Sequence, residues 1–428
     1  MAVEWEKTSL REAGVTLIDC DHRTPPAAEV GYPYIAIPQV KQGRIDLSDV
    51  RLISPEHFKD WTRKAKPQHY DVVLSRRCNP GETAHVPEGL DCALGQNLVL
   101  LRADGTKLFP PFLRWLVRGP NWWEQVGTFI NVGAVFDSLK CADIPNFRLP
   151  LPPLAEQKAI AHILGTLDDK IELNRRMNAT LEAMARALFQ SWFVDFDPVR
   201  AKLDGRQPPG LDKATAALFP AKFQESPLGP IPHGWTVDTI KNRASNVQYG
   251  FTQSSSVNPV GPQFLRITDL RGGNIDWGSV PFCEATEDER EKYRIIDGDI
   301  FIARTGASTG DNIYVVEPPL SVFASYLVRI QFASRGYGRV VGQFMRSSDY
   351  ANHVAGALGG SAQPNASAQA LVAANMAFPP SEIAEAYYRL FRPLDLRRAA
   401  NEREARTLAT LRDTLLPKLL SGELSVRN

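Results

Sequence analysis

Residues 152–192, PPLAEQKAIAHILGTLDDKIELNRRMNATLEAMARALFQSW, carry the strongest structural signal in this 428-residue chain. The segment opens on a proline pair, which is typical of a helix start. Apolar residues recur in it at alternating spacings of four and three, with two asparagines in the middle of the series: Ile160, Leu164, Leu167, Ile171, Asn174, Asn178, Leu181, Ala185, Leu188 and Trp192. This spacing predicts a helix of about forty residues, on the order of 60 Å long, with a heptad stripe along one face.

A second proline pair, Pro379-Pro380, precedes a segment with the same spacing. Its stripe consists of Ile383, Tyr387, Leu390, Leu394, Arg397, Asn401, Glu404, Leu408, Leu411 and Leu415. We expect the two helices to pair within the chain as an antiparallel coiled coil, with Asn174 opposite Asn401 at its centre. Polar residues on such a seam cost stability and fix the register. The alternative is that these asparagines face solvent on ordinary amphipathic helices.

The sequence before each helix is one unit that occurs twice, at an offset of about 227 to 230 residues. PYIAIPQVKQGRID (residues 33–46) matches QFLRITDLRGGNID (263–276), and YDVVLSRRCNPGE (70–82) matches GDIFIARTGASTG (298–310). The matches superimpose Lys41 on Arg271, Gly43 on Gly273, Asp46 on Asp276, Asp71 on Asp299 and Arg76 on Arg304. A repeat of this length is a whole domain and not a solenoid unit.

Short alternating strands such as VVLSR and IFIAR, bounded by Gly, Pro and Asn clusters, predict an irregular α+β domain in each copy. The expected fold is therefore α+β, with two tandem domains joined by two long helices and related by pseudo-twofold symmetry. The expected boundaries are a first domain at 1–150, a central helix at 151–196, a Pro- and Gly-rich linker with one short helix at 197–230, a second domain at 231–378 and a C-terminal helix at 379–424.

Composition narrows the functional classes. No run of eighteen apolar residues occurs, and the N-terminal MAVEWEKTSL lacks the features of a signal peptide, which predicts a cytoplasmic protein. Five cysteines without a CxxC pair predict neither a disulfide framework nor a zinc knuckle. The net charge of +1 means that any nucleic-acid contact must come from local basic patches.

Motifs for catalysis are also absent from the sequence. Gly306–Gly310 is followed by Asp311, without the Lys of a phosphate-binding loop, and Phe109-Pro110-Pro111-Phe112 lacks the polar residue that would hold a flipped adenine. The acidic residues Asp168, Asp169 and 287–291 are better explained as charged helix faces than as a nuclease metal site. We therefore predict no catalytic, cofactor-binding or metal-binding residues in this chain.

The segment LPLPPLAEQKAIAHILGTLDDKIELNRRMNATLEAMARALFQSWFVDFDPV resembles the central region of the specificity subunits of Type I restriction-modification enzymes. The Pro-Pro-Leu-x-Glu-Gln start, the Asn-rich middle and the Ser-Trp-Phe-Val-Asp-Phe-Asp-Pro end occur together and in order. PIPHGWTVDTI, GDIFIARTGASTG and LRDTLLPKLLSGELSV extend the resemblance over nearly the whole chain. Two departures are RRCNPGE in the first copy and PPSEIAEAY, without Glu-Gln, at the second helix.

The resemblance implies a DNA-binding protein without catalysis of its own, in which each copy is a target recognition domain for one half of a split site. The helix pair would space the half-sites by about one duplex turn. It would also dock two methyltransferase (modification) subunits, to which restriction subunits attach in defence against foreign DNA. S-adenosylmethionine, ATP and Mg would belong to those partners, and no membrane is involved.

The repeat separates two kinds of DNA contact, because phosphate contacts position a protein and base contacts specify the sequence. Residues shared by the copies are candidates for framework or phosphate contact: Lys41, Arg271, Arg76 and Arg304. Loop residues that differ are candidates for base contact: Arg23, Thr24, Arg77, Asn79, Thr252, Gln253 and Ser254. Four further candidates are Arg44, Arg266, Thr305 and Ser308, although Arg266 could instead form a cross-sheet ion pair. For each single residue, a solvated loop side chain is the competing interpretation.

Three other functions remain open at this point. The chain could serve an orphan system that only methylates, it could be a coiled-coil adaptor that does not read DNA, or it could be a self-contained nuclease. The DNA sequence and the spacer length do not follow from the residues, because loop conformation and indirect readout both contribute.

Overall fold

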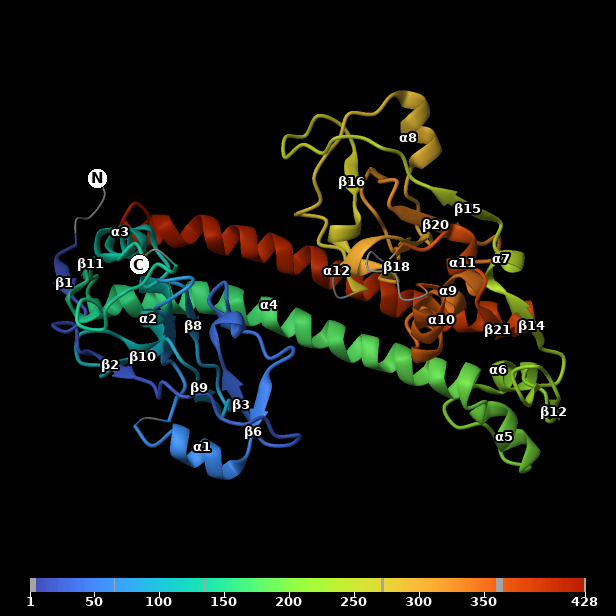
Figure 1. Ribbon diagram of the computed structural model, residues 1–428, viewed down its shortest axis with the longest axis horizontal. Helices are drawn as coiled ribbons and strands as arrows, with labels where there is room; N and C mark the ends of the chain where they lie inside the picture. Colours follow the sequence, from blue (N-terminus) through green and yellow to red (C-terminus); the bar gives the residue numbers. More distant parts are fainter. Residues whose placement is uncertain (1–4, 65, 134, 271–272, 359–364, 427–428) are drawn as a thin grey trace. The chain divides into compact units, whose positions relative to one another are not determined.

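The computed structural model describes residues 5–64, 66–133, 135–270, 273–358 and 365–426. The chain forms two compact units: unit 1 comprises Met1–Glu172 and Thr407–Asn428, and unit 2 comprises Leu173–Arg406. Two long helices, α4 (Leu154–Phe189) and α12 (Ser381–Leu420), each contribute one stretch to unit 1 and one to unit 2 (Figure 1). Their lengths confirm the two predicted helices, and α4 continues as a short π-helix, Gln190–Val194.

Unit 1 is built around a four-stranded antiparallel sheet. Its order is β2 (Val15–Asp19), β10 (Leu98–Ala103), β7 (Val72–Ser75) and β8 (Thr83–His85). A second sheet places β3 (Tyr32–Ile35) between antiparallel β6 (Arg51–Ile53) and parallel β9 (Ala93–Leu94). Two strand pairs complete the unit: β1 (Lys7–Ser9) with β11 (Arg148–Pro150), and β4 (Val40–Lys41) with β5 (Arg44–Ile45). Besides α4 and α12, the described residues of the unit form the α-helices α1 (Pro55–Trp61), α2 (Pro110–Leu116) and α3 (Pro120–Phe129).

Unit 2 repeats this topology. Its main sheet has the order β15 (Asn246–Tyr249), β20 (Leu327–Gln331), β17 (Ile300–Ala303) and β18 (Asn312–Tyr314). The parallel pair β16 (Gln263–Leu265) and β19 (Ser321–Phe323) corresponds to β3 and β9, and the antiparallel pair β14 (Thr236–Thr239) and β21 (Asn375–Phe378) corresponds to β1 and β11. Its helices include α7 (Ile240–Arg243), α8 (Glu287–Tyr293), α9 (Arg335–Phe344), α10 (Ser348–Leu358) and α11 (Ala368–Leu371). The structure confirms the predicted duplication of an α+β domain.

A buried aspartate starts the central strand in each copy. Asp71 precedes β7 and pairs with Arg102 of β10 at 2.6 Å, and its carboxylate also accepts the backbone N–H of Gln68 at 2.7 Å. Asp299 precedes β17 and lies 3.6 Å from Arg329 of β20. The strands themselves, VVLS and IFIA, are fully buried runs of mostly β-branched and aromatic residues. The aspartate that the repeat superimposed is therefore part of the framework.

The long helices run antiparallel in each unit. In unit 1, Arg412 of α12 donates to Asp168 of α4 at 2.6 Å. In unit 2, Asn174 donates to Glu404 at 2.9 Å and Asn178 donates to the Arg398 carbonyl at 3.2 Å, so rising numbers on α4 meet falling numbers on α12.

Both predicted register asparagines are buried, each with 1% of its surface exposed, which excludes the solvent-facing alternative. Asn401 donates to the side chain of Asn178 at 2.8 Å, and Asn174 bonds to Glu404. The observed hydrogen bonds thus lie about one helical turn away from a direct bond between Asn174 and Asn401.

The stripe predicted for α12 needs correction at every seventh position, because Leu390, Arg397, Glu404 and Leu411 are all exposed. Leu390 and Leu411 are each 45% exposed. Their neighbours turn inward instead: Phe391 is fully buried with its ring 4.3 Å from that of Tyr387, and Arg412 reaches Asp168. Because α12 packs on a domain as well as on α4, its buried face is broader than a heptad seam.

Segment 197–230, expected to be a linker with one short helix, is instead packed into unit 2. It forms α5 (Asp197–Leu203), α6 (Lys213–Leu218) and β12 (Phe223–Gln224), which pairs with β13 (Ile231–Pro232). Val199 and Phe219 are buried in the unit 2 core, where Phe219 packs edge-on against Trp192. Among the helices of the described ranges, none combines the length and apolar character required to cross a bilayer.

Candidate nucleic-acid interface

The two arginines shared by the repeats follow the central strands and hold neighbouring loops. The backbone N–H of Arg76 donates to the Asn97 carbonyl at 2.9 Å, and its carbonyl accepts from Leu139 at 2.9 Å. Its side chain is largely buried, with Nη1 3.4 Å from the Leu139 carbonyl and Nη2 3.9 Å from Asp19. These contacts give Arg76 a framework role in unit 1.

Arg304 makes the equivalent backbone bonds in unit 2, donating to Tyr326 at 3.1 Å and accepting from Ala366 at 2.8 Å. Its guanidinium lies 5.0 Å from the Tyr249 ring and donates to the Asn365 side chain at 3.3 Å. The next residues form a turn in which Thr305 bridges Asn365 and the Ser308 carbonyl accepts the Asp311 N–H at 2.9 Å.

The loop that follows Arg76 presents the clearest group of exposed polar side chains in unit 1. Arg77, Cys78 and Asn79 are all exposed. Cys78 has φ 65°, and the Asn79 N–H donates to the Arg77 carbonyl at 2.8 Å, which makes a tight turn. Gly81 donates to Ser75 at 3.0 Å and fixes the base of the loop. This reader loop, residues 77–80, combines a rigid base with an accessible tip.

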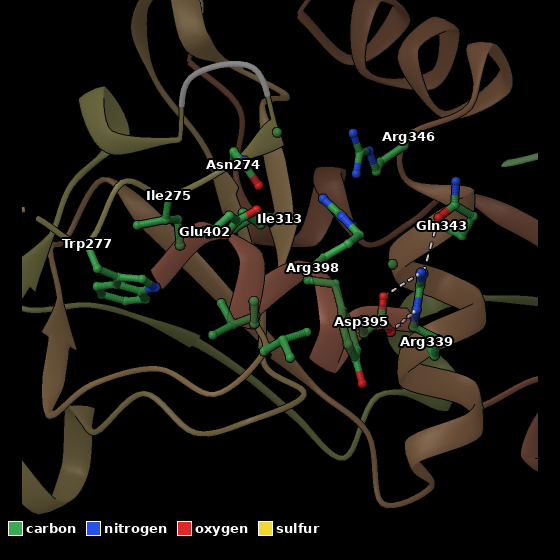
Figure 2. A pocket seen from close by; sticks show the side chains of 16 residues that line it. Asn274, Ile275, Trp277, Ile313, Arg339, Gln343, Arg346, Asp395, Arg398 and Glu402 are labelled. Atoms are coloured by element: carbon green, nitrogen blue, oxygen red, sulfur yellow. Dashed lines mark hydrogen bonds and ion pairs between the residues drawn. The ribbon is translucent and has the colours of Figure 1, made fainter. Parts of the chain in front are cut away.

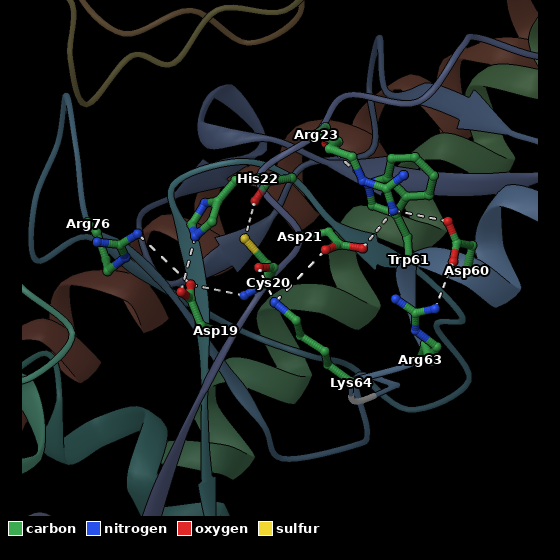
Figure 3. Close-up of polar contacts among 11 residues, drawn as sticks. Asp19, Cys20, Asp21, His22, Arg23, Asp60, Trp61, Arg63, Lys64 and Arg76 are labelled. Carbon is green, nitrogen blue, oxygen red and sulfur yellow. Dashed lines mark hydrogen bonds and ion pairs between the residues drawn. The ribbon is translucent and has the colours of Figure 1, made fainter.

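A second group of residues predicted to contact bases in unit 1 lies around Arg23 (Figure 3). Its guanidinium bonds to Asp21 at 3.1 Å and Asp60 at 3.0 Å, and lies 4.5 Å from the Trp61 ring centroid. Because these ion pairs are exposed, they contribute little stability and leave the guanidinium accessible. The adjacent Thr24 is exposed and accepts from Gln96 at 3.1 Å.

Asp19, Cys20 and His22 bring three possible metal-ligand atoms within 4.8 Å of one another (Figure 3). The Cys20 thiol, however, donates to the Gly95 carbonyl at 2.9 Å, and burial raises its pKa to about 11. Asp19 bonds to His22 at 3.1 Å and lies 3.9 Å from Arg76, so all three groups already have partners within the domain.

Arg44 and Lys41 lie on one strand pair and behave differently. Arg44 is largely buried and binds α4, at 2.7 Å from Asp168 and 3.3 Å from Glu172. Lys41 is exposed, with Asp46 at 2.7 Å. Lys41 is thus accessible to a phosphate, whereas Arg44 attaches the domain to the helix.

Asp168 is the centre of a buried cluster that the sequence did not reveal. Besides Arg44, it contacts Arg412 at 2.6 Å and Arg114 at 3.5 Å. Burial by itself raises the pKa of this carboxyl, but the attraction and hydrogen bond of Arg44, with the other two arginines, lower it to about 2. Its counterpart on α12 is Asp395.

The predicted reader loop of unit 2 is also exposed. Thr252, Gln253 and Ser254 follow β15, and Thr252 donates to the Ser325 hydroxyl at 3.2 Å. The Ser254 N–H donates to the Gln253 side chain at 2.9 Å.

Arg266 does not form the cross-sheet ion pair considered for it. It binds Asp269, three residues further along the chain, through Nε at 3.1 Å and Nη2 at 2.9 Å. This local pair closes the short turn Ile267–Asp269. Arg271 lies outside the described residues.

A small cavity in unit 2 lies between the domain and α12 (Figure 2). Its volume of about 60 Å³ has room for water and little more. On its wall, Arg339 of α9 donates two hydrogen bonds, of 2.7 and 3.1 Å, to the carboxylate of Asp395 on α12. Both side chains are only about 4% exposed. Burial raises the pKa of Glu402 on the same wall. This junction attaches the second domain to α12, as Asp168 attaches the first domain to α4.

The Gln of the Pro-Pro-Leu-x-Glu-Gln motif also has a structural role. Gln157 is buried, accepts the Phe109 N–H at 2.8 Å and donates to the Lys107 and Pro152 carbonyls at 2.9 and 2.8 Å. At the start of α12, Glu385 instead accepts the Gly336 N–H at 3.0 Å. The missing Glu-Gln of the second copy thus reflects a different way of joining a helix to its domain.

Comparison with known proteins agrees with this architecture. Residues 18–183 match the family model of the Type I restriction modification DNA specificity domain. The chain is 22% identical over 279 residues to the Type I restriction enzyme EcoKI specificity subunit of Escherichia coli, covering 64% of this chain and 55% of that protein. It is 36% identical over 142 residues to the HindI specificity subunit of Haemophilus influenzae, covering 31% of this chain and 29% of that protein.

These alignments span about half, or less, of the curated relatives' own length. Among solved structures, the Type I restriction-modification S subunit from M. genitalium shares the fold, with a TM-score of 0.57 and 16% identity over 97% of this chain and 96% of that one. The domain match identifies residues 18–183 as similar to the Type I restriction modification DNA specificity domain, and the chain as a whole shares its fold with the M. genitalium S subunit.

Proposed function

We propose that this chain is the DNA-reading subunit of a Type I restriction-modification complex and has no catalytic activity of its own. The observation that carries the proposal is the duplication, in which the buried framework is repeated and the exposed loops differ. Asp71 with Arg102 recurs as Asp299 with Arg329, whereas reader loop 77–80 has no matching sequence in unit 2. Two similar scaffolds with different loops suit two different half-sites.

The reading residues in this proposal are the exposed ones. Arg77 and Asn79 of unit 1, and Gln253 of unit 2, have side chains that can make bidentate bonds to guanine or adenine. Lys41 is suited to a phosphate contact, because it is exposed and because the matching position of the repeat, Arg271, is also a basic residue. Arg44 and Arg76 are assigned to the framework instead.

The proposed partners are two methyltransferase subunits, with restriction subunits bound through them. Met184 on α4 and Leu411 on α12 occupy matching positions of the repeat, and both are exposed apolar residues on largely charged helices. Two equivalent positions suit two copies of one partner. S-adenosylmethionine, ATP and Mg would be bound by the partners, and the complex would act in the cytoplasm.

The long helices act in this proposal as the spacer between target recognition domains at 1–150 and 231–378. The test is reconstitution of the full chain with its methyltransferase partner on DNA of random sequence. The proposal predicts methylation of one bipartite sequence with a fixed spacer of about one duplex turn. Methylation without sequence preference would contradict it, and metal-dependent cutting by the isolated chain would favour the nuclease instead.

A further inference from the structure

Unit 1 carries an exposed apolar loop that the reader residues do not account for. In residues 130–137, Val132 is 84% exposed, Val135 77% and Phe136 57%. On the preceding helix α3, Trp123 is exposed as well. Scattered single apolar residues are ordinary on a protein surface, but several on one short loop indicate a contact surface.

This apolar loop is attached to reader loop 77–80. Asn131 and Ser138 exchange backbone bonds of 2.8 and 3.0 Å, which close the apolar loop, and Ser138 bridges Arg77. On the other side of the reader loop, the ring of Trp123 lies so close to Gly81 that a Cβ there would be 2.9 Å from it. Exposed apolar groups therefore lie next to Arg77 and Asn79.

The repeat indicates which kind of partner this loop contacts. Leu139 donates to Arg76 as Ala366 donates to Arg304, so residues 130–137, INVGAVFD, correspond to 357–364, ALGGSAQP. The second sequence has one large apolar residue, Leu358, where the first has Ile, two Val and Phe. A protein that docks in the same way on both copies would need the same surface twice. Two DNA half-sites, by contrast, differ from each other.

Charge favours the same partner. Arg77, which bridges Ser138, and Lys140 are exposed near the C-terminal end of the apolar loop, and among the described residues of the loop Asp137 is the single acidic one. These two exposed basic side chains suit contact with a polyanion. Within the grooves of duplex DNA, the C5 methyl group of thymine is the apolar feature that a Val or Phe side chain can recognise.

We propose that Val132, Val135 and Phe136 make apolar contact with base pairs of the half-site that unit 1 reads, with a thymine methyl group as the target. This inference rests on the proposed function and adds a specificity determinant to it. Arg77 and Asn79 supply polar contacts to base edges, and the adjacent loop supplies an apolar contact.

The experiment uses the full chain reconstituted with its methyltransferase partner and short duplexes that contain the mapped bipartite site. Each thymine of the site, apart from those paired with a methylated adenine, is replaced in turn by deoxyuridine, which lacks the methyl group. The wild-type complex should methylate one such duplex, altered in the unit 1 half-site, about tenfold more slowly. The Phe136→Ala complex should methylate the thymine duplex and this deoxyuridine duplex at equal rates. Its requirement for the second half-site should be unchanged.

Leu203→Ala is the matched control, because Leu203 is an exposed apolar residue on α5 of unit 2. It should behave as the wild type does. The inference would be overturned, and the proposed function left intact, if the wild-type complex methylated every deoxyuridine duplex as fast as the thymine duplex and Phe136→Ala kept the wild-type preference among DNA sequences. Loss of the methyltransferase from Phe136→Ala would overturn it in favour of protein docking. A wild-type complex with no bipartite site would instead overturn the proposed function.

Discussion

The basic residues predicted to contact DNA divide into two groups that the sequence alone does not distinguish. Arg44 and Arg76 are largely buried and bind the chain's own carboxylates and carbonyls. Arg77 and Lys41 are exposed. The side chain's own partners therefore decide which candidates remain accessible to DNA.

This division predicts two different phenotypes. Arg77→Ala should relax the methylated consensus at one position of one half-site, at a cost of about 1–3 kcal/mol in discrimination. Lys41→Ala should leave the consensus unchanged and reduce the slope of log affinity against log salt by about one. Binding titrations at several salt concentrations, combined with methylation mapping, would check both. A changed consensus in Lys41→Ala would contradict the assignment.

Asp168 gives a prediction on pH. Its pKa is lowered from 3.8 to about 2, so its contribution to stability is complete above pH 3.8 and is lost as the pH falls through 2. The free energy of unfolding of the wild type should fall by about 2 kcal/mol more than that of Asp168→Asn over this range. Thermal unfolding at a series of pH values measures the difference.

Asp169→Asn is the control, because Asp169 is the exposed neighbouring carboxylate. It should follow the wild-type pH profile. The same acid dependence in Asp168→Asn as in the wild type would show that the cluster around Asp168 does not stabilise unit 1 in the way described.

At the level of helices and strands, each domain is joined to a long helix by a buried ion pair. Asp168 of α4 binds arginines of unit 1, and Asp395 of α12 binds Arg339 of α9 in unit 2. These aspartates occupy matching positions of the repeat. A rigid attachment would suit the proposed role of the long helices as a spacer between two DNA-reading domains.

The Arg339–Asp395 pair should respond strongly to removal of one partner. Arg339→Met leaves a buried carboxylate without its counter-charge and should destabilise unit 2 by about 3–5 kcal/mol. The double variant Arg339→Met/Asp395→Leu should recover most of that loss, because the remaining groups are apolar. Calorimetric unfolding of the full chain checks both variants.

Arg335→Ala on the same helix serves as the control. Its ion pair with Asp297 is much more exposed, so the variant should lose no more than about 1 kcal/mol. A double variant as unstable as Arg339→Met would mean that packing around α9, and not the unpaired charge, sets the cost.

For the molecule as a whole, the repeat could be predicted from the sequence because superimposed residues such as Asp71 and Asp299 have the same structural role, in which each pairs with an arginine of the neighbouring strand. The long helices were readable because their period is regular. Arg44 could not be assigned, because its partner Asp168 lies far away along the chain and only folding brings the two together. The exposure of Leu411 could not be predicted for the same reason, because the neighbouring Arg412 is turned inward by its bond to the distant Asp168.

The mapped positions of methylated adenines in DNA modified by this chain and the proposed methyltransferase partner would test whether two domains read two half-sites. The wild type should give one bipartite sequence with a fixed spacer, and substitution of Thr252, Gln253 and Ser254 by alanine should alter one half-site and keep the other half-site and the spacer. Alteration of both half-sites together, or methylation that follows no bipartite sequence, would contradict the account.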